Sequence, residues 1–491
     1  MNQAGSISRR SFLMGGSATA FGVLSRLDGA AAQALSTAQN DWRILRAQPG
    51  ATVLRATGTA PTAIWGYDGI VPGPTLRVRR GEEVRVRLVN GLPEPTTIHW
   101  HGLRLPNAMD GVPHLTQAPV EPGASFDYRF VAPDAGTFWY HSHQFSSEQL
   151  ARGLYGALIV EEAEPVEVDR DLTLMLDDWR LNRDGSIHTE SFRSMHDAAH
   201  DGRIGEHLTV NGVPQFDIPV RGNERLRLRL INAANARVMT CRLARHRAVI
   251  IALDGQPTEP FIARDSRITL SPGNRVDLFV DALLEPGSVA PLILEDRDSQ
   301  VEIARLVYDS GSPLRPAPLG EPRALPANAL PARMAFSQAL RIDVPLDGGM
   351  MSMAMRDMMR DRRPGEQSAG DRSAPRRAEG FSGAPVWAMA GKAADGHGGP
   401  PLFRVDRGRT VVMAMANRTM FNHAMHIHGH HFRLLDALDD GWKPFWLDTV
   451  LVAPAQTSRI AFVADNPGKW MIHCHMLEHQ ETGMAAWFEV T

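Results

Sequence analysis

Three similar stretches of sequence decide the fold, and the first is Leu76-Arg-Val-Arg-Arg-Gly-Glu-Glu-Val-Arg-Val-Arg-Leu-Val-Asn90. The others run from Ile218 to Asn232 and from Phe403 to Asn417. Each joins a short strand, a turn with glycine, an alternating strand and a closing asparagine. The alternation predicts antiparallel strands with one buried face, and the repeat predicts repeated domains. We therefore expect an all-β chain of three β-sandwich domains.

The length of 491 residues also fits three domains, which we place at 45–163, 168–310 and 336–491. A segment rich in proline and leucine, 311–335, is expected to link the second and third domains. An insert in the third domain, 350–385, starts with a cluster that holds six of the 21 methionines. A polar tract completes this insert, and its composition is typical of a mobile segment.

The composition excludes some classes of function. A net charge of −3 gives no basis for binding nucleic acid or an anionic membrane surface. No apolar run beyond the N-terminus is long enough to span a bilayer. Of the two cysteines, Cys241 is expected to be a buried, inert thiol. If Cys474 binds a metal, no disulfide can form within the chain.

The N-terminal segment 1–34 has the parts of an export signal of the twin-arginine type. Ser8-Arg9-Arg10-Ser11-Phe12-Leu13 precedes a short, weakly apolar run and the small-residue site Ala32-Gln33-Ala34. This order of parts predicts export to a bacterial periplasm by a route that carries folded proteins.

A second repeat links only the first and third domains, and it consists of histidine pairs. The stretch 135–143 ends in His141-Ser-His143 and parallels 467–475, which ends in His473-Cys-His475. In the same way, His99-Trp-His101-Gly parallels His426-Ile-His428-Gly. The middle domain has no such pair, so we expect metal in domains one and three and a spacer role for domain two. Imidazole suits several metals, and its presence alone does not name one.

The last residues favour copper. Cys474, His479 and Met484 follow one another at a spacing of five and five, and His423 supplies a second imidazole. Two histidines, a thiolate and a weak axial methionine are the donors of a blue-copper site. Side chains alternate along a strand, so His473 and His475 should face away from Cys474. One strand would then connect two metal centres.

These motifs resemble the multicopper oxidases, the family of laccases and bacterial cuprous oxidases, from about residue 45 to the C-terminus. The resemblance implies cupredoxin-like Greek-key β-sandwiches and four copper ions. Type 1 copper would be bound by His423, Cys474, His479 and Met484, and type 2 copper by His99 and His426. The type 3 pair would be bound by His101, His141, His143, His428, His473 and His475. Electrons would pass from a reductant through Cys474 to the cluster that reduces dioxygen to water.

Two acids match family positions that serve the cluster. Asp110 lies in Asn107-Ala-Met-Asp-Gly111, and Glu478 lies between two ligands. We expect them to orient ligands and donate protons. On sequence alone, Asp110 fits a turn residue before glycine equally well, and Glu478 could be a solvated carboxylate. The other histidines, including His430 and His431, are interpreted as surface or packing residues.

The reductant is less well specified by the sequence. Thioethers select Cu(I), and a methionine-rich insert in an exported chain resembles the copper-tolerance oxidases. We therefore expect Cu(I) as substrate, with candidate ligands Met351, Met355, Met358, Asp347 and Asp357. Alternatively, Met351, Met355 and Met358 form the packed face of a helix. A laccase acting on small phenols and a non-catalytic copper store are the other hypotheses, and a monomer is expected.

Overall fold

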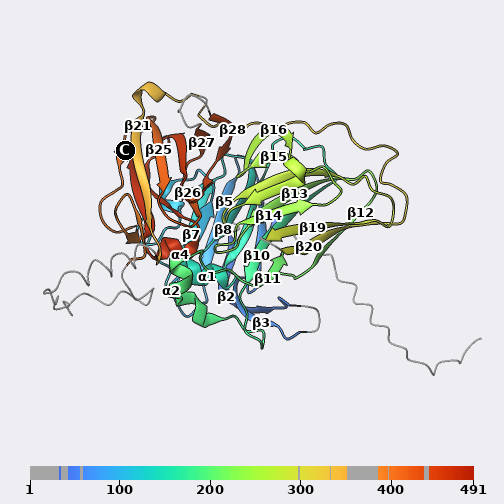
Figure 1. Ribbon diagram of the computed structural model, residues 1–491, viewed down its shortest axis with the longest axis horizontal. Helices are drawn as coiled ribbons and strands as arrows, with labels where there is room; N and C mark the ends of the chain where they lie inside the picture. The colour runs from blue at the N-terminus through green and yellow to red at the C-terminus, as the bar shows by residue number, and fades with distance from the viewer. Residues whose placement is uncertain are drawn as a thin grey trace, which may run out of the picture.

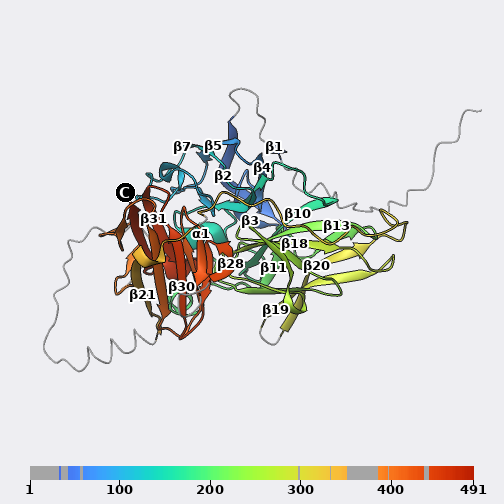
Figure 2. The same ribbon diagram turned by 90° about the horizontal axis from the view of Figure 1, so that it is seen from above.

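The computed structural model describes residues 33–34, 42–55, 59–296, 299–331, 333–350, 385–395, 397–435 and 442–491. Within these ranges the strands form six sheets, which pair into three β-sandwiches (Figure 1). The predicted all-β class is therefore confirmed. In Figure 2 the first sandwich is blue to cyan, the second green to yellow, and the third orange to red.

The first sandwich draws its strands from residues 33–161. One sheet has the order β3 (Thr62–Tyr67), β2 (Arg43–Thr52), β5 (Glu83–Asn90), β7 (Ser125–Val131). The facing sheet has the order β1 (Gln33–Ala34), β4 (Gly73–Arg79), β9 (Tyr155–Glu161), β8 (Gly136–His141), β6 (His99–His101). The short helices η1 (Asn107–Met109) and α1 (Ser146–Ala151) lie in its loops.

The second sandwich draws its strands from residues 170–308. Its six-stranded sheet has the order β11 (His207–Val210), β10 (Arg170–Trp179), β13 (Arg225–Asn232), β18 (Arg275–Asp281), β15 (Val249–Leu253), β16 (Gln256–Ile262). The facing sheet has the order β12 (Phe216–Val220), β20 (Ser299–Tyr308), β19 (Val289–Asp296), β14 (Met239–Leu243), β17 (Arg267–Leu270). Its short helices are η2 (Thr189–Arg193), α2 (Met195–Ala199) and η3 (Arg264–Ser266).

The third sandwich draws its strands from residues 340–490. One sheet has the order β22 (Trp387–Met389), β21 (Leu340–Gly348), β25 (Thr410–Asn417), β30 (Thr457–Val463), β27 (Phe432–Leu435), β28 (Trp442–Leu447). The other has the order β23 (Ala394–Asp395), β32 (Met484–Val490), β31 (Gly468–Cys474), β26 (His423–Ile427), β29 (Thr449–Val452), and β24 (Arg404–Val405) also pairs with β32. The short helices are η4 (Phe336–Gln338) and α4 (Leu477–Glu481).

The repeated stretches form the same central strand in each sandwich, β5, β13 and β25. Each pairs antiparallel with a later strand, β7, β18 or β30. On its other side each pairs parallel with the first long strand of its sandwich, β2, β10 or β21. The prediction of purely antiparallel pairing is therefore wrong. Alternation reports which face is buried, and the direction of the neighbouring strand depends on the connection between strands.

The closing asparagine of the repeat has one structural role, repeated three times. Asn90, Asn232 and Asn417 are buried, and each side-chain amide donates to two backbone carbonyls. Each side-chain oxygen accepts from the backbone N–H two residues on. The amide therefore satisfies the backbone of the loop that follows the strand, which explains why the repeat ends in asparagine.

The second copy of the repeat departs from simple alternation because both faces of β13 are buried. Its arginines are paired with acids: Arg227 donates to Asp277, and Arg229 to Asp171 and Asp277. Arg229 and Asp277 also hydrogen-bond to Thr137 of the first sandwich. The face expected to meet solvent is therefore an interface with the first sandwich, and buried charges persist there because they are paired.

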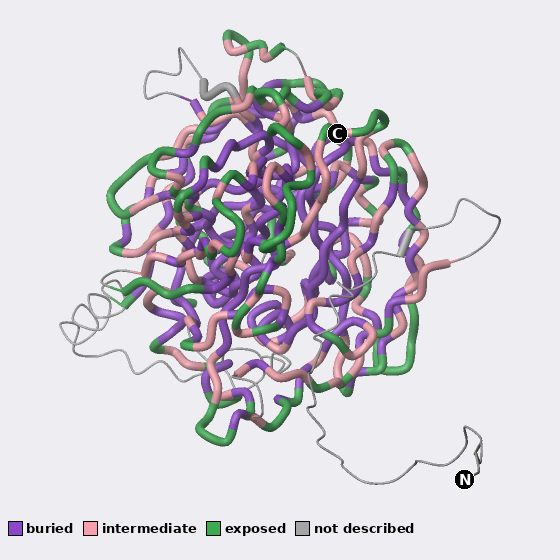
Figure 3. The backbone as a smooth tube through the Cα atoms, turned by 90° about the vertical axis from the view of Figure 1, so that its right-hand side faces the viewer, coloured by how far each residue is buried: buried purple, intermediate pink, exposed green. Residues whose placement is uncertain are grey.

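Each sandwich contacts the other two. Strand β8 packs against β16 and β18, β28 packs against β15 and β16, and η1 packs against β31. One apolar core runs from the first sandwich into the third, and buried backbone passes through the centre of the molecule (Figure 3). Among the described residues, no helix has the length and apolar character needed to cross a membrane.

Candidate metal centres

The first candidate centre lies inside the third sandwich, where Cys474 ends β31. Its Sγ lies 3.8 Å from Nδ1 of His423, on β26, and 3.8 Å from Nδ1 of His479, on α4. The two Nδ1 atoms are 3.2 Å apart. Met484, at the start of β32, is buried in the same core as Cys474. All four side chains are shielded from solvent.

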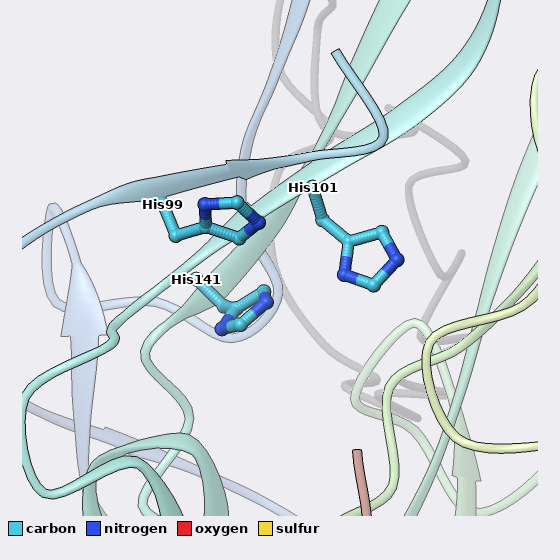
Figure 4. A group of neighbouring side chains, drawn as sticks. All are labelled: His99, His101 and His141. Carbon is cyan, nitrogen blue, oxygen red and sulfur yellow. The ribbon is translucent and has the colours of Figure 1, made fainter. Parts of the chain in front are cut away.

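The second candidate centre lies between the first and third sandwiches. Strand β6 supplies two of its eight buried histidines, and Figure 4 shows these beside one from the adjacent strand β8. On the other side, β26 and β31 pair so that His426 lies opposite His473. The Nε2 atom of His473 is 3.0 Å from Nε2 of His428 and 3.5 Å from that of His143. The eight are His99, His101, His141, His143, His426, His428, His473 and His475.

Backbone carbonyls orient several of these rings. Nδ1 of His99 donates to the carbonyl of Asp110 at 2.8 Å. Nδ1 of His141 donates to the carbonyl of Ser142 at 2.9 Å, and Nδ1 of His426 to that of Asp448 at 3.0 Å. In each ring the remaining Nε2 is buried and has no hydrogen-bond partner within the described part of the chain. A hydrogen bond from one ring nitrogen fixes the tautomer and leaves the lone pair of the other nitrogen free. This arrangement is typical of a metal-binding histidine.

The rings at the first centre point the opposite way. Nε2 of His479 donates to the carbonyl of His200 at 2.7 Å, and Nε2 of His423 to Oγ1 of Thr419 at 2.9 Å. Their Nδ1 atoms are therefore the ones that face Cys474. The three ligand atoms lie within 4.8 Å of one another, which fits a single ion held by two imidazoles and a thiolate.

Burial determines the charge of these groups. It lowers the pKa of His101, His141, His143, His428, His473 and His475 well below the usual value, and of His479 to about 4. The rings are therefore neutral, as metal ligands must be. Burial also raises the pKa of the Cys474 thiol to about 12. Its thiolate thus depends on a bound cation, which deprotonates a coordinating thiol.

Asp110 is buried and joins two of the histidines. One carboxylate oxygen accepts from Nδ1 of His428 at 2.8 Å, and the other lies 3.3 Å from Nδ1 of His99. It comes from the loop after η1, so it joins a ring of the first sandwich to a ring of the third. The structure therefore places Asp110 where it can orient ligands.

Asp448 was missed by sequence reasoning. Its Oδ1 lies 3.2 Å from Nε2 of His101, and its carbonyl binds His426. Arg275 of the second sandwich donates to both of its oxygens, at 2.9 and 2.6 Å. Burial alone would raise the pKa of Asp448, but Arg275 holds this pKa well below its usual range. The signal was a single acid inside the apolar run from Trp446 to Val450.

The second sandwich is therefore more than a spacer, because it supplies the buried Arg275 to this centre. It also contacts Glu478 on α4. That carboxylate accepts from the backbone N–H of Arg203 at 3.0 Å and from Nδ2 of Asn235 at 2.9 Å. Burial raises the pKa of Glu478. Glu478 is therefore not a solvated loop residue.

Other predicted residues lie elsewhere. Met351, Met355, Met358 and Asp357 lie outside the described residues, while Asp347 is half-buried on β21 and faces Arg418 at 4.0 Å. His430 and His431 are buried, and the ring of His430 packs on Phe462 and Trp470, in agreement with a packing role. Cys241 is a buried free thiol whose pKa burial raises to about 12, as expected of an inert cysteine.

Comparison with known proteins agrees with this geometry. Three family models described as multicopper oxidase match residues 50–165, 170–288 and 373–491. The multicopper oxidase MmcO of Mycobacterium tuberculosis is 29% identical, over 97% of this chain and 95% of that protein. A copper resistance protein A homolog of Pseudomonas syringae pv. tomato is 25% identical, over 89% and 90%.

Among solved structures, the multi-copper oxidase from Pseudomonas thermotolerans is 34% identical. The match covers 94% of this chain and 100% of that one, with a TM-score of 0.78. The matches span all three sandwiches, and the buried histidine clusters are candidate copper sites, as expected of this family. The chain therefore belongs to the multicopper oxidase family and is an oxidoreductase that uses dioxygen as its electron acceptor.

Proposed function

We propose that this chain is an exported cuprous oxidase that couples the oxidation of Cu(I) to Cu(II) to the reduction of dioxygen to water. In the balanced reaction, four Cu(I) ions, one dioxygen and four protons give four Cu(II) ions and two waters. Export rests on the Arg9-Arg10 signal in the N-terminal segment. A periplasmic enzyme would meet copper before it enters the cytoplasm.

We assign four copper ions to the two centres. Type 1 copper is held by His423, Cys474, His479 and Met484; type 2 by His99 and His426; and the type 3 pair by His101, His141, His143, His428, His473 and His475. The unused Nε2 atoms of His99, His141 and His426 support this assignment. In His101 the unused atom is Nδ1, because Nε2 faces Asp448. Bound copper supplies one-electron redox chemistry at the first centre and dioxygen reduction at the second.

The chain itself connects and serves the two centres. Cys474 faces one centre while its neighbours His473 and His475 face the other, so electrons cross through the bonds of adjacent residues. Asp110 orients His428 and His99 through its two oxygens. We assign the role of proton donor to Glu478, and the raised pKa that burial gives its carboxyl supports this role.

The variants Asp110→Asn and Glu478→Gln are expected to lose different properties. D110N should lower copper loading at the second centre or turnover by about 10- to 100-fold, since it weakens the orientation of two ligands. E478Q should keep its copper but reduce dioxygen uptake by about 100-fold or more. The measurements are copper content by mass spectrometry and oxygen uptake. Glu481→Gln, a half-buried acid on the same helix, is the control, and unchanged turnover in E478Q would reject the proton role.

The choice of Cu(I) rests on where the methionine-rich segment is attached. The residues that flank that segment are hydrogen-bonded to each other, since the backbone N–H of Gly349 donates to the carbonyl of Val386 at 3.1 Å. The next residue, Trp387, is buried. Its ring centroid lies 4.3 Å from that of His479 and 5.0 Å from that of His423. The segment thus leaves and re-enters the fold beside the first centre. The name of the copper resistance relative supports the same substrate class.

Replacing the methionines of this segment should separate the two substrate hypotheses. In a variant with leucine at 351, 353, 355, 358 and 359, kcat/KM for Cu(I) should fall by about tenfold or more, equal to about 1.4 kcal/mol of lost interaction. Turnover of a small phenol should be unchanged, because leucine fills similar volume and both copper centres stay intact. Oxygen uptake with each donor measures both values.

The outcome of this experiment decides between a cuprous oxidase and a laccase. If the leucine variant oxidises Cu(I) like the wild type, the segment does not serve the substrate. If the wild type also prefers the phenol by kcat/KM, the chain is a laccase and the proposal fails.

A further inference from the structure

The two imidazoles of the first centre have no open edge among the described residues. His423 and His479 are fully buried, and their outward Nε2 atoms are occupied by Thr419 and by the His200 carbonyl. Trp387 covers both rings and donates from Nε1 to the carbonyl of Ala198 at 2.6 Å. A donor outside the protein therefore cannot touch either ring directly.

Behind Trp387 lies the end of α2, a short helix of the second sandwich, together with His200, the residue that follows it. Its carbonyls at Ala198 and His200 hold Trp387 and His479, and α2 packs against α4, next to it in Figure 1. The outer side of the same turn carries the side chains of His196 and His200. An electron that reaches His479 from the side of the second sandwich therefore passes through the end of α2 and His200.

The two side chains are placed to share a metal ion. His196 and His200 are four residues apart, and their rings stack with centroids 4.2 Å apart. Two histidines four residues apart on a helix are a recurrent metal-binding pair. Here His196 lies in α2, and His200 directly follows its last residue, Ala199. Nδ1 of His200 donates to the carbonyl of His196 at 2.6 Å, which leaves Nε2 as the ligand atom. Since 78% of the His196 side chain is exposed, its ring can turn to meet the same ion.

A soft donor, Met420, is the chain neighbour of a residue that contacts this pair. The ring of Phe421 meets that of His200 edge-on, with centroids 5.6 Å apart. Its neighbour Met420 is 72% exposed, the most exposed of the large apolar residues described. Imidazole suits copper in both oxidation states, and thioether selects Cu(I). Met420 is therefore an exposed thioether one residue away from a contact of the histidine pair.

We propose that His196 and His200 form a docking site for substrate Cu(I), from which the electron reaches His479 through the backbone carbonyl of His200. The docked Cu(I) loses one electron and leaves as Cu(II), and the first centre accepts that electron. The path consists of one residue's covalent bonds and one hydrogen bond of 2.7 Å. This inference rests on the proposed cuprous oxidase function and adds a site to it.

The test uses the copper-loaded full-length enzyme and the double variant His196→Gln/His200→Gln. Side-chain replacement keeps the His200 carbonyl, so the type 1 absorption band and the reoxidation of pre-reduced enzyme by dioxygen should not change. Titration with Ag(I), a redox-inert probe for Cu(I), should show one ion fewer than in the wild type. The kcat/KM for Cu(I) should fall by about tenfold, equal to about 1.4 kcal/mol.

The matched control is His114→Gln/His397→Gln, a second pair of neighbouring imidazoles with centroids 5.1 Å apart. It should keep the wild-type kcat/KM for Cu(I). Equal Ag(I) stoichiometry or an unchanged kcat/KM for Cu(I) in the H196Q/H200Q variant would each overturn the docking site. If the double variant does not load copper, the single variant H196Q gives the same decision.

Failure of the proposed function gives a different result. A wild-type enzyme that takes up no oxygen with Cu(I) would reject the cuprous oxidase assignment, whatever the variants do. The Ag(I) titration would then still decide whether the histidine pair binds a monovalent soft cation.

Discussion

Replacing Cys474 with serine is expected to abolish oxygen uptake with every electron donor. The Cys474 sulfur lies 3.8 Å from Nδ1 of both His423 and His479, and a serine hydroxyl is a poor ligand for copper at neutral pH. The same change removes the covalent path to His473 and His475. The purified variant should lack the type 1 absorption band, while the second centre, on the other side of the strand, keeps its copper.

Cys241 offers the matched control. It is also buried, and burial raises the pKa of both thiols to about 12, yet it lies in the core of the second sandwich. Cys241→Ala should therefore keep the type 1 band and turnover. A C474S enzyme that still consumes dioxygen would show that electrons reach the second centre by another route.

Replacing Arg275 with methionine is expected to damage both the fold and the second centre. The guanidinium donates to both oxygens of Asp448, and both side chains are fully buried. Removing one member of a buried ion pair leaves an uncompensated charge and costs about 3–5 kcal/mol of folding free energy. Asp448 also lies 3.2 Å from Nε2 of His101, so its movement should disturb that ligand and lower the copper content. Denaturant unfolding and copper analysis measure the two effects.

A comparable arginine separates stability from copper binding. Arg225 is equally buried and donates to both oxygens of Asp281, within the second sandwich. Arg225→Met should lose stability but retain the copper of the second centre. If R275M and R225M bind the same amount of copper, Arg275 has a purely structural role.

The predictions that came from the sequence concern local patterns. Alternating apolar residues identified the central strands, because a strand with one buried face repeats every second residue. Paired histidines in repeats one and three predicted which sandwiches contribute the buried histidine clusters. Residues such as Asp110 were ambiguous, since the same Asp-Gly sequence serves a turn or a ligand shell equally well.

Other residues could not be predicted, because they act at long range. Arg275 lies 173 positions before Asp448 in the chain. His200 reaches His479 through its backbone carbonyl, an atom that every residue type has. No pattern of side chains records such a contact, and a buried arginine in β18 resembles an exposed one until the packing partner is known.

The sequence alone thus predicted the class of fold, which the structure confirms, and it supplied the proposed copper donors and the proposed link from Cys474 to its neighbours. These predictions depend on residue type and on the two-residue period of a strand. The packing of three sandwiches decided the rest. It converted the charged face of β13 into an interface, fixed which ring nitrogen each histidine presents, and placed the α2 turn over His479. Each of these results depends on groups far apart in sequence, which only tertiary contact brings together.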